Sequence, residues 1–288
     1  MKARACLWLL VSASICLADR QIGSAPSVGP ASANVRANDP LAAPGEHFRP
    51  RLGALGYQVL WRSAVAGELT FNIDRRDNRY TLALRGESNE QIDRIYKVRY
   101  QAISQLSANP FLPLRAVYRE NVQNDRKHFT ADFHPEGRIT VVRDRNRPGR
   151  DPSKTVYDLR PEKFAVDALS GLCLIMKTDW KEGMTLNFEV VFGKDRFDAT
   201  LRCVGRARMD VMGIRREAWV IAVDMAEIEE DGASNAPKDA DAIAKDAVRI
   251  YLSNDPYREI LRLTGNTPLG DVQVRLRRFS PLKPPAQP

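Results

Sequence analysis

Apolar and polar residues alternate along most of this chain from Gly56 onward, and that period of two limits the fold more than any other feature. In the segment Arg196–Gly205, the odd-numbered positions from Phe197 to Cys203 are apolar, whereas the positions between them are polar. Successive side chains of a β-strand point to opposite faces of its sheet, so such a segment buries one face and exposes the other.

The same alternation recurs in many short segments, with turn-forming residues between them. The clearest are Tyr57–Trp61, Glu68–Asp74, Arg79–Gly86, Lys97–Leu106, Leu114–Asn121, His128–Phe133, Arg138–Arg143, Thr185–Phe192, Arg216–Met225, Val248–Ser253 and Gly270–Phe279. We therefore expect a mainly β fold: a single curved antiparallel sheet of about ten strands, shaped as a half-open barrel or β-roll.

One segment, "VDALSGLCLIMKTDW", follows helical spacing instead. Its apolar residues recur every three or four positions, at Leu169, Leu172, Cys173 and Met176. Asp167 stands where a helix N-cap is favoured. We expect the sheet to wrap around this one amphipathic helix. A second helix is expected at Pro237–Val248, in the acidic loop that begins at Glu227, and residues 227–246 form an acidic insertion.

The amino terminus is typical of a secretory signal peptide. Lys2 and Arg4 precede the uncharged apolar stretch Ala5–Ala18, which is too short to cross a bilayer comfortably. We expect cleavage after Ala18 and location in the periplasm. Lipid anchoring at Cys16 is the less favoured reading, because bulky Ile15 occupies the position where acylation requires a small residue.

The remaining chain divides into three parts. Residues 19–47 are rich in Ala, Pro, Ser and Gly without a period, which indicates a disordered tether. Residues 48–279 form the single expected β domain, and residues 280–288 a disordered tail. No later stretch is apolar enough for a transmembrane helix, so none is expected in the mature chain.

The formal net charge of +8 favours anionic partners such as lipid head groups or acidic polymers. The alternative is that these charges only keep the surface solvated. Nucleic acid is not expected, because no pattern of interleaved basic and aromatic residues is present.

No residue pattern predicts catalysis, a metal site or a cofactor. The three histidines lack metal-ligand spacing. Ser170 lacks the flanking glycines of a nucleophile elbow, so we expect a polar residue in the first helical turn. Cys173 and Cys203 either form one disulfide or remain two buried thiols, and both readings stay open.

Two further sets of residues have a binding reading and a structural one. Trp61, Phe71 and Trp219 lie on strand-like segments and either line a ligand cavity or fill the core. In "SNDP", the run Asn254–Asp255–Pro256 has the composition of a turn between two strands, and we expect a structural hairpin there rather than a catalytic cluster.

Several stretches together resemble one bacterial exported family, domain of unknown function 3108. The resemblance rests on "LGYQVLWRSAVAGELTFNI", "IDRIYKVRYQAISQLSANPFLPLRAVYRE", "VDALSGLCLI" and "IYLSNDPYREILRL…GDVQVRL". It covers roughly Gly56–Arg277 and implies a periplasmic or outer-envelope β protein without known catalytic residues. The expected fold is also similar to the lipoprotein carriers, in which a helix plugs a half-open barrel.

These observations favour a non-enzymatic envelope protein that binds a lipid, an acyl chain or a partner polypeptide on a curved sheet. Two alternatives stay open. One is a periplasmic hydrolase that acts on an envelope polymer through a carboxylate pair. The other is a structural adaptor in an envelope complex that docks through its acidic insertion.

Overall fold

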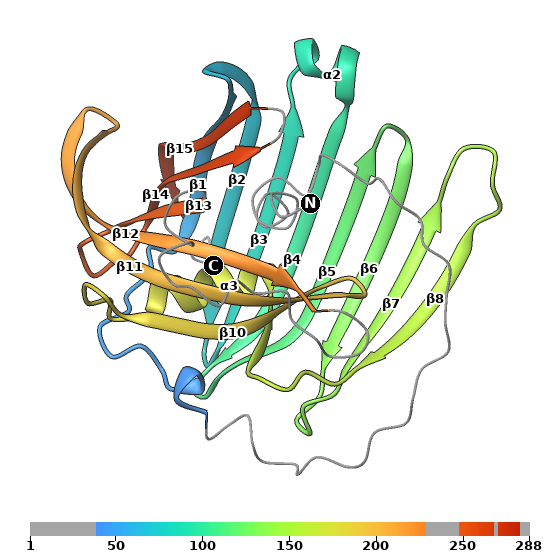
Figure 1. The fold of residues 1–288 in the computed structure, drawn as a ribbon, viewed down its shortest axis with the longest axis horizontal. Helices are drawn as coiled ribbons and strands as arrows, with labels where there is room; N and C mark the ends of the chain where they lie inside the picture. The colour runs from blue at the N-terminus through green and yellow to red at the C-terminus, as the bar shows by residue number, and fades with distance from the viewer. Residues whose placement is uncertain (1–38, 229–247, 268–269, 283–288) are drawn as a thin grey trace, which may run out of the picture.

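The computed structural model describes residues 39–228, 248–267 and 270–282. Within these ranges one 15-stranded sheet curls around a central helix (Figure 1). The strands are β1 (Gly53–Trp61), β2 (Ala64–Arg76), β3 (Arg79–Ser88), β4 (Val98–Ala108), β5 (Phe111–Val122), β6 (Asp125–Phe133), β7 (Ile139–Asn146), β8 (Ser153–Leu159), β9 (Ala165–Asp167), β10 (Thr185–Phe192), β11 (Asp195–Val211), β12 (Ile214–Glu227), β13 (Val248–Ser253), β14 (Ile260–Thr267) and β15 (Gly270–Pro281). The helices are the 3-10 helix η1 (Pro40–Ala42), α2 (Glu90–Tyr96) and α3 (Ala168–Lys177).

The order of strands in the sheet follows two meanders that meet where the first strand pairs with the last. From that β1–β15 pair, one meander runs through β2 to β8 and the other runs back through β14 to β10. All neighbours are antiparallel except the short β9, which is parallel to β10. The expected single curved antiparallel sheet is thus confirmed. The expected number of about ten strands was too low, and β8, β9 and β14 are not among the segments whose alternation predicted a strand.

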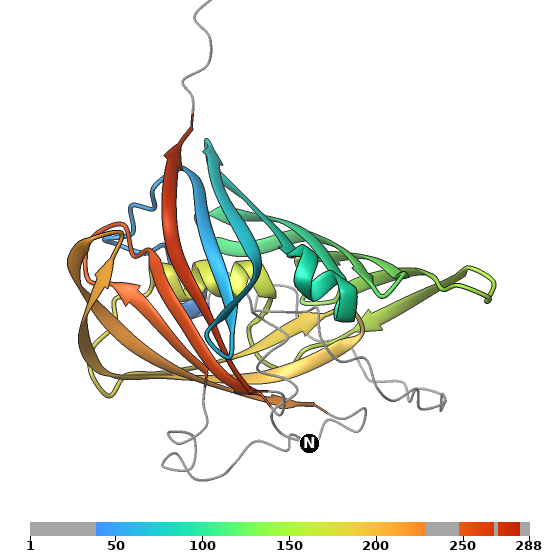
Figure 2. The same cartoon turned by 90° about the horizontal axis from the view of Figure 1, so that it is seen from above.

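Helix α3 lies inside the curl of the sheet, and Figure 2 shows strands on several sides of it. The expected N-cap is confirmed: the Asp167 side chain accepts hydrogen bonds from the amides of Leu169 and Ser170. All ten residues of α3 are buried, including the polar Ser170 and Lys177. Strands β3, β4, β9 and β10 pack against the helix.

The segment before β1 corrects the expected extent of the disordered tether. Asp39 caps η1, and Ala42 is 1% exposed. The Lys177 ammonium at the end of α3 donates a hydrogen bond of 2.6 Å to the carbonyl of Ala43. A buried ammonium needs such partners, so residues 39–47 belong to the folded part. The second expected helix falls almost wholly outside the described residues.

The register between β1 and β2 shifts after Val59, because Val59 pairs with Gly67 and Leu60 pairs with Val65, which leaves Ala66 of β2 as the extra residue. Alternation puts Tyr57, Val59 and Trp61 on one face of β1. Tyr57 is 6% exposed, whereas Val59 and Trp61 are half-buried, and Leu60 is buried at 8% exposure. A bulge bends the strand that carries the extra residue and increases the local twist.

Candidate binding surface

A fully buried carboxylate ties α3 to the sheet. Asp167 Oδ2 accepts hydrogen bonds from Ser104 of β4 at 2.8 Å and from Ser170 at 2.5 Å. Tyr118 of β5 joins the cluster, since its hydroxyl accepts from the amide of Ala168 at 3.3 Å. Burial, and then the nearby Asp167 carboxylate, raise the pKa of Tyr118 far above its ordinary value. Ser170 is 0% exposed and serves this cluster, so it is not placed to act as a nucleophile on a ligand.

A small cavity of about 20 Å³ lies between α3 and strands β10–β13. Apolar side chains line it, among them Leu172, Ile175 and Phe188. This volume is close to that of a single water probe, far below what an acyl chain needs. The plug helix fills the space in which a half-open barrel could hold a ligand.

The aromatic residues considered as ligand-lining do not come together at a cavity. Phe71 is 2% exposed and Trp219 is 6% exposed, and both belong to the hydrophobic core. The guanidinium of Arg206 lies 4.2 Å from the centre of the Trp219 ring. Half-buried Trp61 has the Arg62 guanidinium 5.7 Å from its ring centre.

Cys173 and Cys203 are both buried free thiols, so the structure contains no disulfide between them. Cys173 is on α3 and Cys203 on β11, and each is 0% exposed. Burial raises the pKa of the Cys173 thiol to about 12. Neither thiol is therefore a reactive group at neutral pH.

The run Asn254–Asp255–Pro256 lies in the connection between β13 and β14. Asp255 Oδ1 accepts hydrogen bonds from the Ser253 hydroxyl at 2.8 Å and from the amide of Tyr257 at 3.0 Å. Its other oxygen accepts from Arg216 of β12 at 2.7 Å. Every polar group of Asp255 thus supports the turn or its neighbouring strand.

A trough of about 620 Å³ crosses strands β3–β8. The lining takes three consecutive residues from each of β3 to β7, and from β8 the pair Ser153 and Lys154 with Pro152 directly before it. On β5 the middle residue, Glu120, is buried on the inner side of the sheet, and Arg119 and Asn121 beside it are more exposed. The trough therefore lies on the outer face of the sheet, with backbone as its floor and side chains as its walls. Six strands spaced about 4.8 Å apart give it a length of about 24 Å.

Each wall of this outer trough is a row of residues that stand opposite one another on neighbouring strands. One row is Arg85, Gln101, Arg119, His128, Asp144 and Lys154. The other row is Glu87, Arg99, Asn121, Arg126 and Asn146. Neither row contains Phe, Tyr or Trp, so the His128 imidazole is the one aromatic ring in these two rows.

Positive charge dominates the walls, with five Lys or Arg residues against two carboxylates. Arg85 lies 3.4 Å from Glu87, and His128 lies 3.8 Å from Asp144. The side chains of Arg119, Arg126 and Lys154, by contrast, take part in no hydrogen bond or ion pair with the part of the chain that the structure describes. Their guanidinium and ammonium groups stay available to a ligand.

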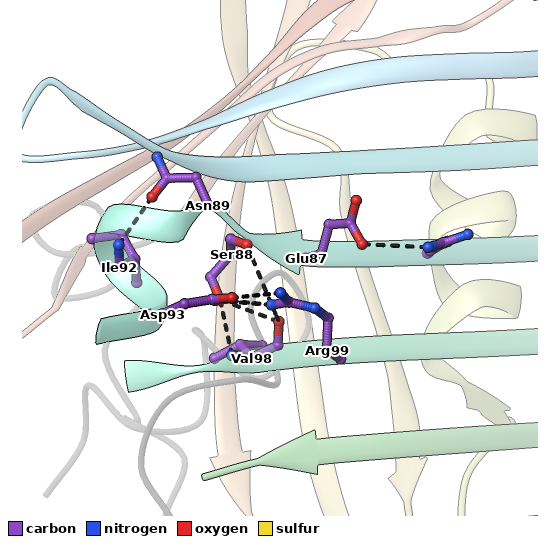
Figure 3. Close-up of polar contacts among 8 residues, drawn as sticks. Glu87, Ser88, Asn89, Ile92, Asp93, Val98 and Arg99 are labelled. Carbon is purple, nitrogen blue, oxygen red and sulfur yellow. Dashed lines mark hydrogen bonds and ion pairs between the residues drawn. The ribbon is translucent and has the colours of Figure 1, made fainter. Parts of the chain in front are cut away.

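Helix α2 connects β3 to β4, and Figure 3 shows its Asp93 beside Arg99, a residue of the outer trough. Its Asp93 accepts a two-pronged pair of hydrogen bonds from Arg99, at 2.9 and 2.5 Å, and another from the Ser88 hydroxyl. These bonds, led by that of Arg99, lower the pKa of Asp93 to about 2. Asn89 caps the helix by accepting from the amide of Ile92. The hydrogen bonds to Asp93 hold the Arg99 side chain in place, so this residue is less available to a ligand than the other wall residues.

A buried ion pair lies directly beneath the floor. Glu120 points inward, is 4% exposed, and its carboxylate lies 3.4 Å from Lys127 of β6. Burial raises the pKa of Glu120 to about 7 despite this neighbour. The ion pair could not be predicted from the spacing of Glu120 and Lys127 along the chain, because it depends on the register between β5 and β6.

The family and the fold are settled by comparison with known proteins. The profile of the family described as "Protein of unknown function (DUF3108)" matches residues 56–277. The chain belongs to this family. A crystal structure of a β-barrel-like protein of the domain of unknown function DUF1849 from Brucella abortus is similar to this DUF3108 chain, with a TM-score of 0.51 at 12% identity. The likeness covers 81% of this chain and 98% of the other, and it concerns the fold alone. No curated protein matches.

The described residues include neither a metal-binding cluster nor a helix that could span a membrane. No cluster of three or more His, Cys, Asp or Glu residues is arranged to hold a metal ion there. No helix in the same part of the chain is long and apolar enough to cross a membrane.

Proposed function

We propose that this DUF3108 protein is a non-enzymatic binding protein that holds an extended acidic polypeptide segment in the outer trough. The observation that carries this proposal is the pair Arg119 and Arg126, which face the trough from opposite walls and have no partner among the described residues. Guanidinium groups match carboxylates in charge and in hydrogen-bond geometry. We also propose the periplasm as its compartment, on the strength of the amino-terminal pattern.

The dimensions support a linear ligand rather than a compact one. A trough of about 24 Å accommodates about seven residues of extended polypeptide. The sheet's own hydrogen-bond ladders occupy the backbone groups of the floor, so recognition falls to the walls. The amides of Asn121, Asn146 and Gln101 supply neutral donors and acceptors for a peptide backbone.

The other ligand classes and functions fit less well. A lipid or acyl chain fits less well, because the apolar cavity beside α3 measures only about 20 Å³. A hydrolytic carboxylate pair is also disfavoured. Glu87 and Asp144 are four strands apart, about 19 Å along the sheet, whereas such pairs lie within about 10 Å. Glu120 points to the opposite face. An adaptor role for the acidic insertion falls outside the described residues.

Fluorescence anisotropy with labelled peptides of about seven residues tests the proposal. A Glu-rich peptide should bind, and a Lys-rich peptide of equal length should not. The double variant Arg119→Glu/Arg126→Glu should weaken binding by about tenfold or more, since each exposed charge pair contributes up to about 1 kcal/mol. Added salt should weaken it as well.

The matched control is Arg79→Glu/Arg160→Glu. It changes the net charge equally, but both residues are exposed and outside the outer trough. Equal losses in the two double variants would reduce the effect to net charge and remove the trough from the explanation. Equal binding of Glu-rich and Lys-rich peptides would do the same.

A further inference from the structure

The open sheet leaves two edges among the described residues, and they differ in accessibility. At one end lies β9, a three-residue strand whose residues are all buried. At the other end lies β8, whose seven residues are exposed or half-buried. In Figures 1 and 2 the β7–β8 hairpin extends away from α3 and from the β10–β15 half of the sheet. A neighbouring chain could therefore approach β8 without meeting the body of the molecule.

Strand β8 lacks two of the features that usually prevent edge-to-edge pairing, a proline and a β-bulge. It contains no proline, and its register with β7 runs without a bulge from Ser153 to Leu159. Its central residue Val156 is 62% exposed on the outer face. An unprotected edge strand presents a row of backbone donors and acceptors that another strand can satisfy.

The sequence of β8 is complementary to itself. If two copies pair antiparallel around a two-fold axis at Val156, each residue meets the one at the mirrored position. Lys154 then stands opposite Asp158 of the partner subunit, and this pair forms twice. The axis also brings the two exposed Val156 side chains together and sets Thr155 opposite the partner's Tyr157. Opposite charges and apolar residues directly across an antiparallel pair stabilise it.

Both charged residues are available for this contact. Lys154 has no ion pair or hydrogen bond with a described residue. Asp158 has one neighbour, Arg138, at 3.8 Å, and its side chain is 52% exposed. Such a loose exposed pair contributes little.

We propose that two copies of this chain associate through β8, in antiparallel register centred on Val156, so that one sheet continues across the dimer. A two-fold contact of this kind uses the same patch on both subunits and closes after two copies. The proposal does not depend on the peptide-binding function. Arg119 and Arg126, which carry that function, lie on β5 and β6.

Sedimentation equilibrium of the purified protein over a range of concentrations tests the proposal. The wild type should show a reversible monomer–dimer equilibrium. Lys154→Asp should raise the dissociation constant by about tenfold, because two attractive pairs become two repulsive ones. Asp158→Lys should do the same by placing lysines opposite one another.

The deciding experiment mixes these two single variants. A Lys154→Asp chain and an Asp158→Lys chain restore opposite charges at both positions, so the mixture should dimerise like the wild type. Lys181→Asp, which changes an exposed lysine outside β8, should leave the dissociation constant unaltered. A wild type that stays monomeric at every concentration overturns the proposal. So does a mixture that fails to regain association, or a single variant that dimerises like the wild type.

Discussion

Removing the buried carboxylate of Asp167 should destabilise the protein more than removal of any exposed cap. In the folded state, Asp167 accepts from the amides of Leu169 and Ser170 and from the hydroxyls of Ser104 and Ser170. In Asp167→Ala, the helix loses an N-cap that contributes about 1 kcal/mol. Buried hydroxyls left without a partner cost about 1 to 3 kcal/mol each. Ser104 and Ser170 lie 2.9 Å apart and can still bond to each other. We expect a total loss of about 3 to 5 kcal/mol.

Urea unfolding followed by tryptophan fluorescence measures this loss, since Trp180 beside α3 is 3% exposed. The midpoint should fall with an unchanged slope. Asp167→Asn keeps an oxygen acceptor for the helix amides and should lose only about 1 to 2 kcal/mol. Asn89→Ala removes the half-exposed cap of α2 and serves as the matched control, with an expected loss of about 1 kcal/mol. If Asp167→Ala costs no more than Asn89→Ala, the buried cluster does not hold α3 in the way described.

Two further predictions concern the core and the ion pair beneath the trough. Gly171→Ala should raise the thermal midpoint, because the new methyl group would lie 3.4 Å from Val166 and 3.8 Å from Phe188, at ordinary contact distances. Ala in a helix is favoured over Gly by up to about 1 kcal/mol, and a lowered midpoint would contradict this. Burial raises the pKa of Glu120 from 4.5 to about 7. The folded protein therefore keeps a proton that the unfolded chain releases in this window, and stability should fall as pH rises through it. Glu120→Gln should flatten that decline in urea unfolding at the two ends of the window, and an equally steep decline in the variant would refute the assignment.

Local patterns predicted much of the fold because burial on one face is a local property of a strand. The apolar set from Phe197 to Cys203 is buried as expected, and Asp167 caps α3 as expected. The bulge at Ala66 escaped prediction, since it depends on how β1 pairs with β2 and not on the composition of either strand. The same holds for η1, which packs against β5, and for the hydrogen bond from Lys177 to Ala43, which lie 134 positions apart.

The outer trough could not be predicted, because it exists only through the register of six strands. Arg119 and Arg126 read as ordinary outward positions on two strands, and nothing in their spacing sets them facing across a trough. An available signal was the run of long polar and charged side chains at outward positions of consecutive strands. The strand that ends the sheet is likewise a property of the whole topology, so β8 did not stand out.

The pairing of β1 with β15 sets an order of events during synthesis. These strands begin at Gly53 and Gly270. One edge of β1 therefore stays unpaired until β15 has been synthesised. During that interval the meander from β1 to β8 has two uncovered edges instead of one. Pairing between residues so far apart in sequence is slow, and uncovered edges favour aggregation. A chain that ends before β15 would leave one edge of β1 unpaired, and this edge would favour aggregation.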